Sequence, residues 1–304
     1  MIFTTGILSA FLVNDIVCLV MVPLVMNLTR RLRLPALPYL LGVATASNIG
    51  SVATITGNPQ NMLIGSYSGI QYREFLLHLG PVAVAGMFFD WLVLWWLFRR
   101  EISGSTPNNE IPAISVRPSN LWKPGMVLAC VVIGFFAGAP PALASALGAA
   151  ALLISRTTDS HKLYGEVDWG LLVFFIGLFL IVGGAENAGI VAQFLRAGDY
   201  VNLHASEAFT LITVVLSNLV SNVPAAMLLK YLVPGFPDPH RAWLLLAMAS
   251  TLAGNLTITG SVANIIVVET AKPDLHIGFR QYFRAGLPVT LGTLLIGWAW
   301  LRFA

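Results

Sequence analysis

The stretch Thr54-Ile-Thr-Gly57-Asn-Pro-Gln-Asn61 decides the fold, because it puts a glycine, a proline and several hydrogen-bonding side chains inside an apolar segment. Proline and glycine interrupt helices, and proline also lacks a backbone N–H. The motif returns as Thr257-Ile-Thr-Gly260-Ser-Val-Ala-Asn264, with five identities in eight positions at an offset of 203 residues. The sequence therefore predicts two helices that are each broken near the centre.

Each predicted broken helix follows an apolar stretch that has its own polar centre. Asn14 and Asp15 lie within residues 2–28, and Ser221, Asn222 and Pro224 lie within residues 208–233. A polar centre favours a re-entrant helical hairpin with a polar tip over a plain spanning helix. A repeated hairpin and broken helix is typical of secondary transporters with two related halves.

The composition indicates a membrane protein. Hydrophobic residues make up 57% of the 304 residues and charged residues 10%, against about 25% charged in globular proteins. There is apolar sequence for roughly eight crossings, because one crossing takes about 20 residues. The basic residues stand in short runs between apolar segments, so we expect them to set membrane orientation and expect no nucleic-acid partner. The sequence thus predicts an all-α polytopic membrane protein.

The chain divides into two predicted repeats joined by a cytoplasmic linker. The first repeat, 1–98, comprises a hairpin at 2–28, a broken helix at 34–70 and a span at 75–98, and the linker is 99–124. The second repeat, 125–304, comprises spans within 125–186, an interfacial helix at 187–206, a hairpin at 208–233, a broken helix at 242–268 and a last span at 275–304. The first repeat has no counterpart of the spans at 125–186, so we expect an N-terminally shortened chain.

The distribution of basic residues predicts how the repeats are oriented. If the first hairpin enters from the cytoplasm, 12 of the 17 Lys and Arg residues face the cytoplasm and five face the other side. Cytoplasmic loops carry the excess of Lys and Arg in membrane proteins. The second hairpin then enters from the opposite side, which makes the two repeats inverted.

The hairpin tips and helix breaks are the predicted binding residues, because broken backbone inside a bilayer needs polar partners. The N-termini of half-helices attract anions, while hydroxyls and amides can coordinate Na⁺. The alternative is that these side chains only join helices. The candidates are Asn14, Asp15, Thr54, Thr56, Gly57, Asn58, Pro59, Asn61, Ser221, Asn222, Pro224, Thr257, Thr259, Gly260, Ser261 and Asn264.

Asp15 is the acidic residue within the predicted tips and breaks, so it is the candidate for coupling transport to a proton or cation. The alternative is a carboxylate that caps the amides of its own hairpin. Asp90, beside Trp91, is expected to be structural or interfacial. No phosphate-binding G-x-x-x-x-G-K-[ST] motif occurs. We expect no cofactor other than a coupling Na⁺ or H⁺, and no enzymatic activity.

Several runs resemble the ion transporter superfamily of arsenite permeases, NhaD-type antiporters and citrate and dicarboxylate carriers. They are Phe11-Leu-Val-Asn14-Asp15, Ala46-Ser-Asn48-Ile-Gly50 leading into Gly57-Asn58-Pro59-Gln60-Asn61, the run from Val167 to Phe179, and Ser221-Asn222-Val223-Pro224. The likeness is closest to a bacterial inner-membrane anion transporter branch. In the dicarboxylate carriers a Ser-Asn-Thr triplet at each tip binds carboxylate and sodium. Here Asn14 and Asn222 match its asparagine, and only the second tip keeps the serine.

This resemblance implies a permease of the bacterial inner membrane, multi-pass and homodimeric, that moves a small inorganic or organic anion with H⁺ or Na⁺. Arsenite or antimonite efflux and Na⁺/H⁺ antiport are the alternatives within the transporter class. An intramembrane enzyme and a non-transporting truncated fragment are the alternatives outside it.

Overall fold

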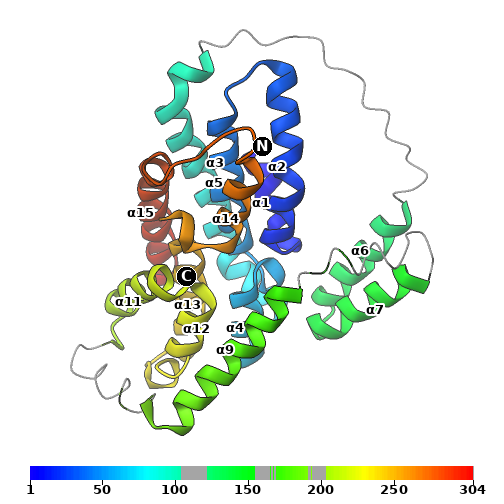
Figure 1. The fold of residues 1–304 in the computed structure, drawn as a ribbon. Helices are drawn as coiled ribbons and strands as arrows, with labels where there is room; N and C mark the ends of the chain where they lie inside the picture. Colours follow the sequence, from blue (N-terminus) through cyan, green and yellow to red (C-terminus); the bar gives the residue numbers. More distant parts are fainter. Residues whose placement is uncertain are drawn as a thin grey trace.

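All regular secondary structure in the described part of the chain is helical, which confirms the predicted all-α class (Figure 1). The computed structural model describes residues 1–103, 122–154, 165, 167, 169–190, 193 and 203–303. Most of the predicted linker at 99–124 and most of the predicted interfacial helix at 187–206 lie outside these residues.

The N-terminal part runs as a helix pair, an interrupted helix and a long helix. Its elements are α1 (Ile2–Phe11), α2 (Asn14–Leu32), α3 (Ala36–Ser51), the 3-10 turn η1 (Ile55–Gly57), α4 (Pro59–Ser68) and α5 (Tyr72–Ser103). Pro59 is the first residue of α4, where its missing N–H costs nothing. The helix ends therefore fall where the sequence places its polar and proline residues.

The second part has a similar order after three further helices. Its elements are α6 (Trp122–Phe136), α7 (Pro141–Ile154), α9 (Trp169–Asn187), α11 (Ser206–Val220), α12 (Asn222–Leu229), η3 (Val233–Gly235), α13 (Pro239–Ala253), η4 (Ile258–Gly260), α14 (Val262–Ala271) and α15 (Phe279–Phe303). The pair α6 and α7 stands beside the main helical bundle (Figure 1).

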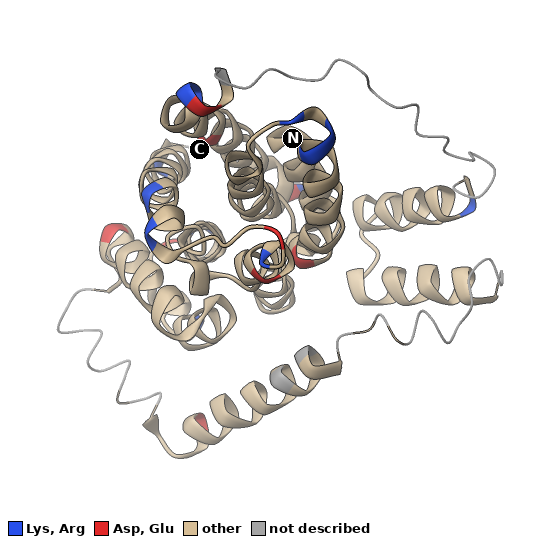
Figure 2. Ribbon diagram, turned by 45° about the horizontal axis from the view of Figure 1, so that its top comes forward, with Lys and Arg blue, Asp and Glu red and all other residues tan. Residues whose placement is uncertain are grey.

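Two of these helices, α5 and α15, are long and apolar enough to cross a membrane by themselves. Six other apolar helices are shorter, at 10–17 residues. Lys, Arg, Asp and Glu are sparse in the described part and lie mostly near helix ends (Figure 2). The number of crossings, predicted as roughly eight, is not decided by these lengths and stays a prediction.

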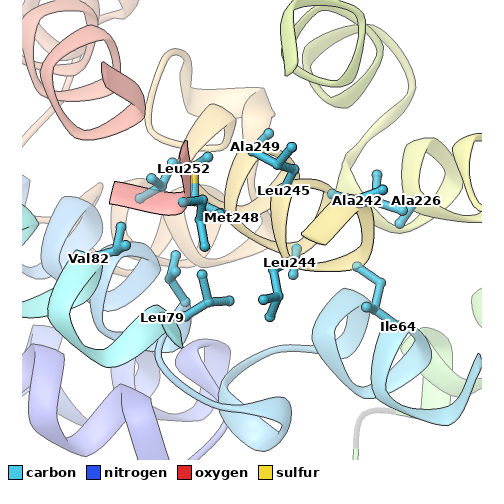
Figure 3. Packing of buried hydrophobic residues seen from close by; sticks show 14 of the residues in the cluster. Ile64, Leu79, Val82, Ala226, Ala242, Leu244, Leu245, Met248, Ala249 and Leu252 are labelled. Atoms are coloured by element: carbon cyan, nitrogen blue, oxygen red, sulfur yellow. The ribbon is translucent and has the colours of Figure 1, made fainter. Parts of the chain in front are cut away.

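The core is built around α13. Leu244, Leu245, Met248 and Leu252 are each at most 1% exposed and pack between α4, α5 and α12 (Figure 3). In a bilayer such packing is favoured by dispersion contacts rather than by removal of apolar surface from water. This interior helix connects the N-terminal and C-terminal parts of the bundle.

Two glycines bring α1 and α3 close together. A Cβ atom on Gly50 would overlap the backbone of Gly6. Small residues allow this close approach of helix backbones in membrane bundles. The contact fixes α1 against the helix that leads into the first interruption.

Candidate functional site

The first interruption, between α3 and α4, is held together by the side chain of Asn61. Its amide nitrogen donates to the carbonyl oxygens of Ser51 (3.1 Å) and Thr54 (3.0 Å). Asn58 caps α4, since its side-chain oxygen accepts the Asn61 backbone N–H at 2.8 Å. Backbone groups released by the break therefore find partners within the motif itself.

The second interruption, between α13 and α14, has the same arrangement. Asn264 donates to the carbonyl oxygens of Gly254 (2.6 Å) and Thr257 (3.0 Å). Thr257 has φ −134° and ψ 162°, against φ −136° and ψ 161° at Thr54. The shared backbone shape follows from the shared sequence letters.

Each interruption also needs its glycine. A Cβ atom on Gly57 would overlap the Ser51 backbone, and one on Gly260 would approach the Gly254 carbonyl oxygen. The close packing of each turn therefore favours glycine at this position.

Asn48 on α3 joins the two interruptions. Its amide nitrogen donates to the side-chain oxygens of Asn255 (2.8 Å) and Asn264 (3.0 Å). Its oxygen accepts from Asn14 (3.0 Å) and from the Ser261 hydroxyl (3.0 Å). One fully buried side chain thus contacts the first hairpin and the second interruption.

Thr251 on α13 occupies the position that lies 203 residues after Asn48. It donates to the Asn61 oxygen (3.4 Å) and accepts from Asn58 (3.2 Å) and Gln60 (3.2 Å). Asn61 and Asn58 stand 203 residues before Asn264 and Ser261, which are two of the three residues that Asn48 contacts at the second interruption. The contacts between the two parts of the chain are therefore reciprocal.

The helix tips and interruptions meet at a small cavity of about 30 Å³. Four helices begin at its wall, namely α2, α4, α12 and α14. The lining residues are Asn14, Asp15, Pro59, Gln60, Phe175, Ser221, Asn222, Val223, Ser261 and Val262.

Four helices direct the positive ends of their dipoles at this cavity, whose wall also contains the acidic residue Asp15. The first turns of a helix present free N–H groups and the positive end of the helix dipole. None of the lining residues is Lys, Arg or His. The arrangement suits a small solute with oxygen atoms.

Six of the predicted binding residues line the cavity: Asn14, Asp15, Pro59, Ser221, Asn222 and Ser261. The other ten are outside its wall. Thr54 donates to the Ala10 carbonyl oxygen, and Thr56 contacts the Tyr72 hydroxyl at 2.9 Å. Thr257 donates to Asn218 at 3.1 Å, and Thr259 is exposed. Gly57, Asn58, Asn61, Gly260 and Asn264 shape the interruptions, and Pro224 lies in the first turn of α12.

The predicted binding residues did not include Asn48, Gln60, Thr251 or Asn255. Asn48 and Thr251 share the 203-residue offset of the repeated motif, which was a usable signal. Asn255 has no such counterpart, and Gln60 lay inside the quoted motif. These omissions concern residues that connect helices far apart in the sequence.

The second tip has an unusual backbone. Ser221 has φ 78° and ψ 160°, a region that is populated almost only by glycine. The Asn222 side chain is satisfied when its nitrogen donates to the carbonyl oxygens of Ser250 (2.9 Å) and Gly260 (3.2 Å). At the first tip, Val13 has φ −58° and ψ 128°, without strain. Strained residues of this kind cluster at functional sites.

Asp90, which was expected to be structural or interfacial, is fully buried, as the structural alternative requires. It lies on α5, away from the cavity wall, with its Oδ2 atom 3.0 Å from the Thr45 hydroxyl oxygen.

A helical bundle with four helix beginnings around one polar cavity defines a membrane transporter rather than a soluble protein. Residues 1–252 match the family described as "Citrate transporter". The chain belongs to this family, which bears out the predicted resemblance to the ion transporter superfamily.

The names of similar proteins are consistent with a membrane transporter. The chain is 32% identical to a "46 kDa membrane protein" of Mycobacterium leprae, over 97% of the chain and 74% of the relative. It is 29% identical to "Silicon efflux transporter LSI3" of Oryza sativa, over 96% of the chain and 76% of the relative. It is 29% identical to "Inner membrane protein YbiR" of Escherichia coli, over 99% of the chain and 76% of the relative.

Proposed function

We propose that the chain is a secondary active transporter that moves a small anionic solute through the cavity between α2, α4, α12 and α14. The observation that carries this proposal is the convergence of four helix N-termini on one polar space. Helix N-termini bind anions through free N–H groups and the helix dipole. A transporter for an anion can therefore work without a basic side chain at its site.

The two parts of the chain act in this proposal as inverted repeats with re-entrant hairpins. The predicted repeats are 1–98 and 125–304. Reciprocal hydrogen bonds of Asn48 and Thr251 support a two-fold relation between them. In transporters with such repeats, motion of one repeat against the other alternates access to the site. The protein would be multi-pass in the bacterial inner membrane.

Coupling to H⁺ or Na⁺ and assembly as a homodimer belong to the same proposal. Asp15 lies in the cavity wall and is 7% exposed. Buried carboxylates inside membrane proteins are typical of proton and cation sites. The homodimer rests on the family resemblance.

A neutral oxyacid such as arsenous or silicic acid is the second candidate solute. Two observations favour it: the acceptor Asn14 Oδ1 has no hydrogen-bond partner among the described residues, and Asp15 stands beside it. Acceptor oxygens bind O–H donors better than they bind anions. Relatives bear the names "Silicon efflux transporter LSI3" and "Putative transporter arsB", the second from Dictyostelium discoideum at 25% identity.

Thermal stability of the purified protein tests the site. The probes are citrate, sulfate, phosphate, arsenite and silicic acid, each with and without Na⁺. A solute that binds only the folded state stabilises it by about 2.7 kcal/mol at 100 times its Kd. Asn14→Ala and Asn222→Ala should abolish the shift, because both side chains line the cavity. Asn27→Ala is the control, since Asn27 is an exposed residue of α2.

A shift with citrate, sulfate or phosphate supports the anion, and a shift with arsenite or silicic acid alone supports the oxyacid. A shift that survives both cavity substitutions would place the solute elsewhere and contradict the proposed site.

A further inference from the structure

Asp90 is a buried acid without a basic partner. Its side chain is 0% exposed, and none of the ion pairs among the described residues involves it. Its Oδ1 atom has no hydrogen-bond partner in the described structure. An ionised carboxylate in this position would be a buried charge supported by a single hydrogen bond, which costs several kcal/mol.

The Thr45 hydroxyl fits a neutral Asp90 better than an ionised one. Thr45 Oγ1 lies 2.9 Å from the Leu41 carbonyl oxygen and 3.0 Å from Asp90 Oδ2. A hydroxyl has one proton to donate and can accept as well. If Asp90 holds a proton, it donates to Thr45 and Thr45 donates to Leu41, so both contacts are hydrogen bonds at once. If Asp90 is ionised, Thr45 can serve only one of the two oxygens.

The neighbouring elements offer no countercharge to Asp90. On α15, Tyr282 is buried and its hydroxyl has no hydrogen-bond partner among the described residues. The arginines of α15 are exposed, and Arg302 pairs with Glu207 at 3.6 Å; the other two are Arg280 and Arg284. Thr45 is the polar contact from α3, and α1 has no titratable side chain.

More distant charged groups lie at the far ends of the adjacent helices. On α13, His240 pairs with Glu74 of α5 at 3.0 Å. Glu74 lies about 24 Å from Asp90 along α5, at a rise of 1.5 Å per residue. Arg241 of α13 stands next to His240 at the same end of that helix. Lys123 of α6 stacks on Trp122.

A chain of hydrogen bonds joins this region to the cavity. Asn255 donates to the Thr45 carbonyl oxygen at 3.3 Å and accepts from Asn48 at 2.8 Å. Asn48 in turn accepts from the cavity residues Asn14 and Ser261. Thr45 is therefore connected to the cavity wall through its backbone carbonyl and then through the side chains of Asn255 and Asn48.

We infer that Asp90 is a proton-binding site, separate from the cavity, that carries a proton in this conformation and is linked to the solute through Thr45, Asn255 and Asn48. One proton binds to the carboxylate and no other bond changes. The role in coupling rests on the proposed transport function, whereas the proton site itself does not.

Infrared spectroscopy of the full-length protein tests the proton site without any solute. An un-ionised carboxylic acid has a carbonyl band that is resolved from carboxylate bands. We expect such a band at neutral pH in the wild type, its loss in Asp90→Asn, and its retention in Glu101→Gln, a matched change at an exposed residue of the same helix. An identical band in Asp90→Asn overturns the proposal, as does a wild type without it.

Thr45→Val is the second variant and covers the case in which Asp90→Asn does not fold. Valine removes the hydroxyl but keeps the shape, so the band should persist and move to higher frequency as its hydrogen bond is lost. An unchanged band position contradicts the Asp90–Thr45 bond.

Coupling is tested in liposomes with arsenite and citrate as probes under an imposed pH gradient. Wild type and Glu101→Gln should accumulate the transported probe, and Asp90→Asn should exchange it without accumulation. Accumulation by Asp90→Asn overturns the coupling role. A wild type that moves neither probe removes that role together with the proposed function for these solutes, while the infrared band still decides the proton site.

Discussion

The two helix interruptions share one backbone shape but are supported differently. In the first, Asn58 caps α4 with its own side chain and Pro59 follows as the first helical residue. In the second, Ser261 makes no side-chain cap and donates instead to Asn48 at 3.0 Å. The helix after the first interruption thus has a cap from its own motif, whereas the corresponding residue at the second interruption hydrogen-bonds to α3 instead.

The two hairpin tips differ in backbone strain and in the exposure of nearby residues. The first tip has an unstrained Val13, whereas Ser221 at the second tip has a left-handed φ of 78°. Thr56 beside the first interruption is 6% exposed, and its counterpart Thr259 is exposed to the surroundings. We infer that the second half is the more easily rearranged of the two, because strain and missing local contacts lower the cost of local opening.

The largest expected effect comes from removing the link between the halves. Asn48→Ala should lower the free energy of unfolding by about 3 kcal/mol, because several buried polar partners lose their hydrogen bonds together. Thr251→Ala at the corresponding position should cost about 1 kcal/mol. Chemical unfolding in detergent measures both. Equal losses would contradict the central role given to Asn48.

The next largest expected effect is the difference in stability loss between alanine substitutions of the two glycines. Gly57→Ala should cost about 2 kcal/mol by overpacking, because its Cβ would meet Ser51 backbone atoms that cannot move aside. Gly260→Ala should cost less, about 1 kcal/mol, because side-chain atoms of Asn218 and Thr257 share its contacts. The same unfolding measurement applies, and a larger loss at Gly260 would show that the second interruption is the more rigid one.

A smaller effect is expected at the residues before α4 and α14, where one substitution should lower stability and the other should weaken solute binding. Asn58→Ala should cost about 1 kcal/mol of stability through loss of the α4 cap, with solute binding retained. Ser261→Ala should weaken solute binding, because Ser261 lines the cavity and Asn58 does not. Thermal shift with whichever of the five probe solutes stabilises the wild type measures both properties. If Asn58→Ala loses solute binding and Ser261→Ala keeps it, the roles given to these two residues would be wrong.

The smallest expected effect is a gain at the second tip. Ser221→Gly should stabilise the protein by about 0.5 kcal/mol, because glycine adopts the φ of 78° without strain and this outweighs its greater freedom when unfolded. Val13→Gly should destabilise by a similar amount, since no strain is relieved there. Destabilisation by both substitutions would show that Ser221 is not strained.

The sequence was informative wherever a local signal was strong. Apolar runs predicted an all-helical membrane chain, and the polar motifs at 54–61 and 257–264 indicated breaks where α3 and α13 in fact end. The same reasoning proposed nearly all polar residues of the two motifs as binding residues, with Gln60 left out. In the structure Thr54 contacts α1 and Thr257 contacts α11 instead. Helix breaking depends on neighbouring residues, whereas the direction of a side chain depends on the helices packed around it.

The sequence by itself determined the helical class, the positions of the interruptions and the family, because composition, glycine, proline and motif identity act over short stretches of chain. Only the tertiary structure decided that Asn48 hydrogen-bonds to the second interruption and that Thr251 hydrogen-bonds to the first. It also decided that Asp90 is buried against Thr45. Asn48 and Asn264 are 216 residues apart. A single polar residue in an apolar helix carries no local pattern that names such a partner, so packing alone assigns it.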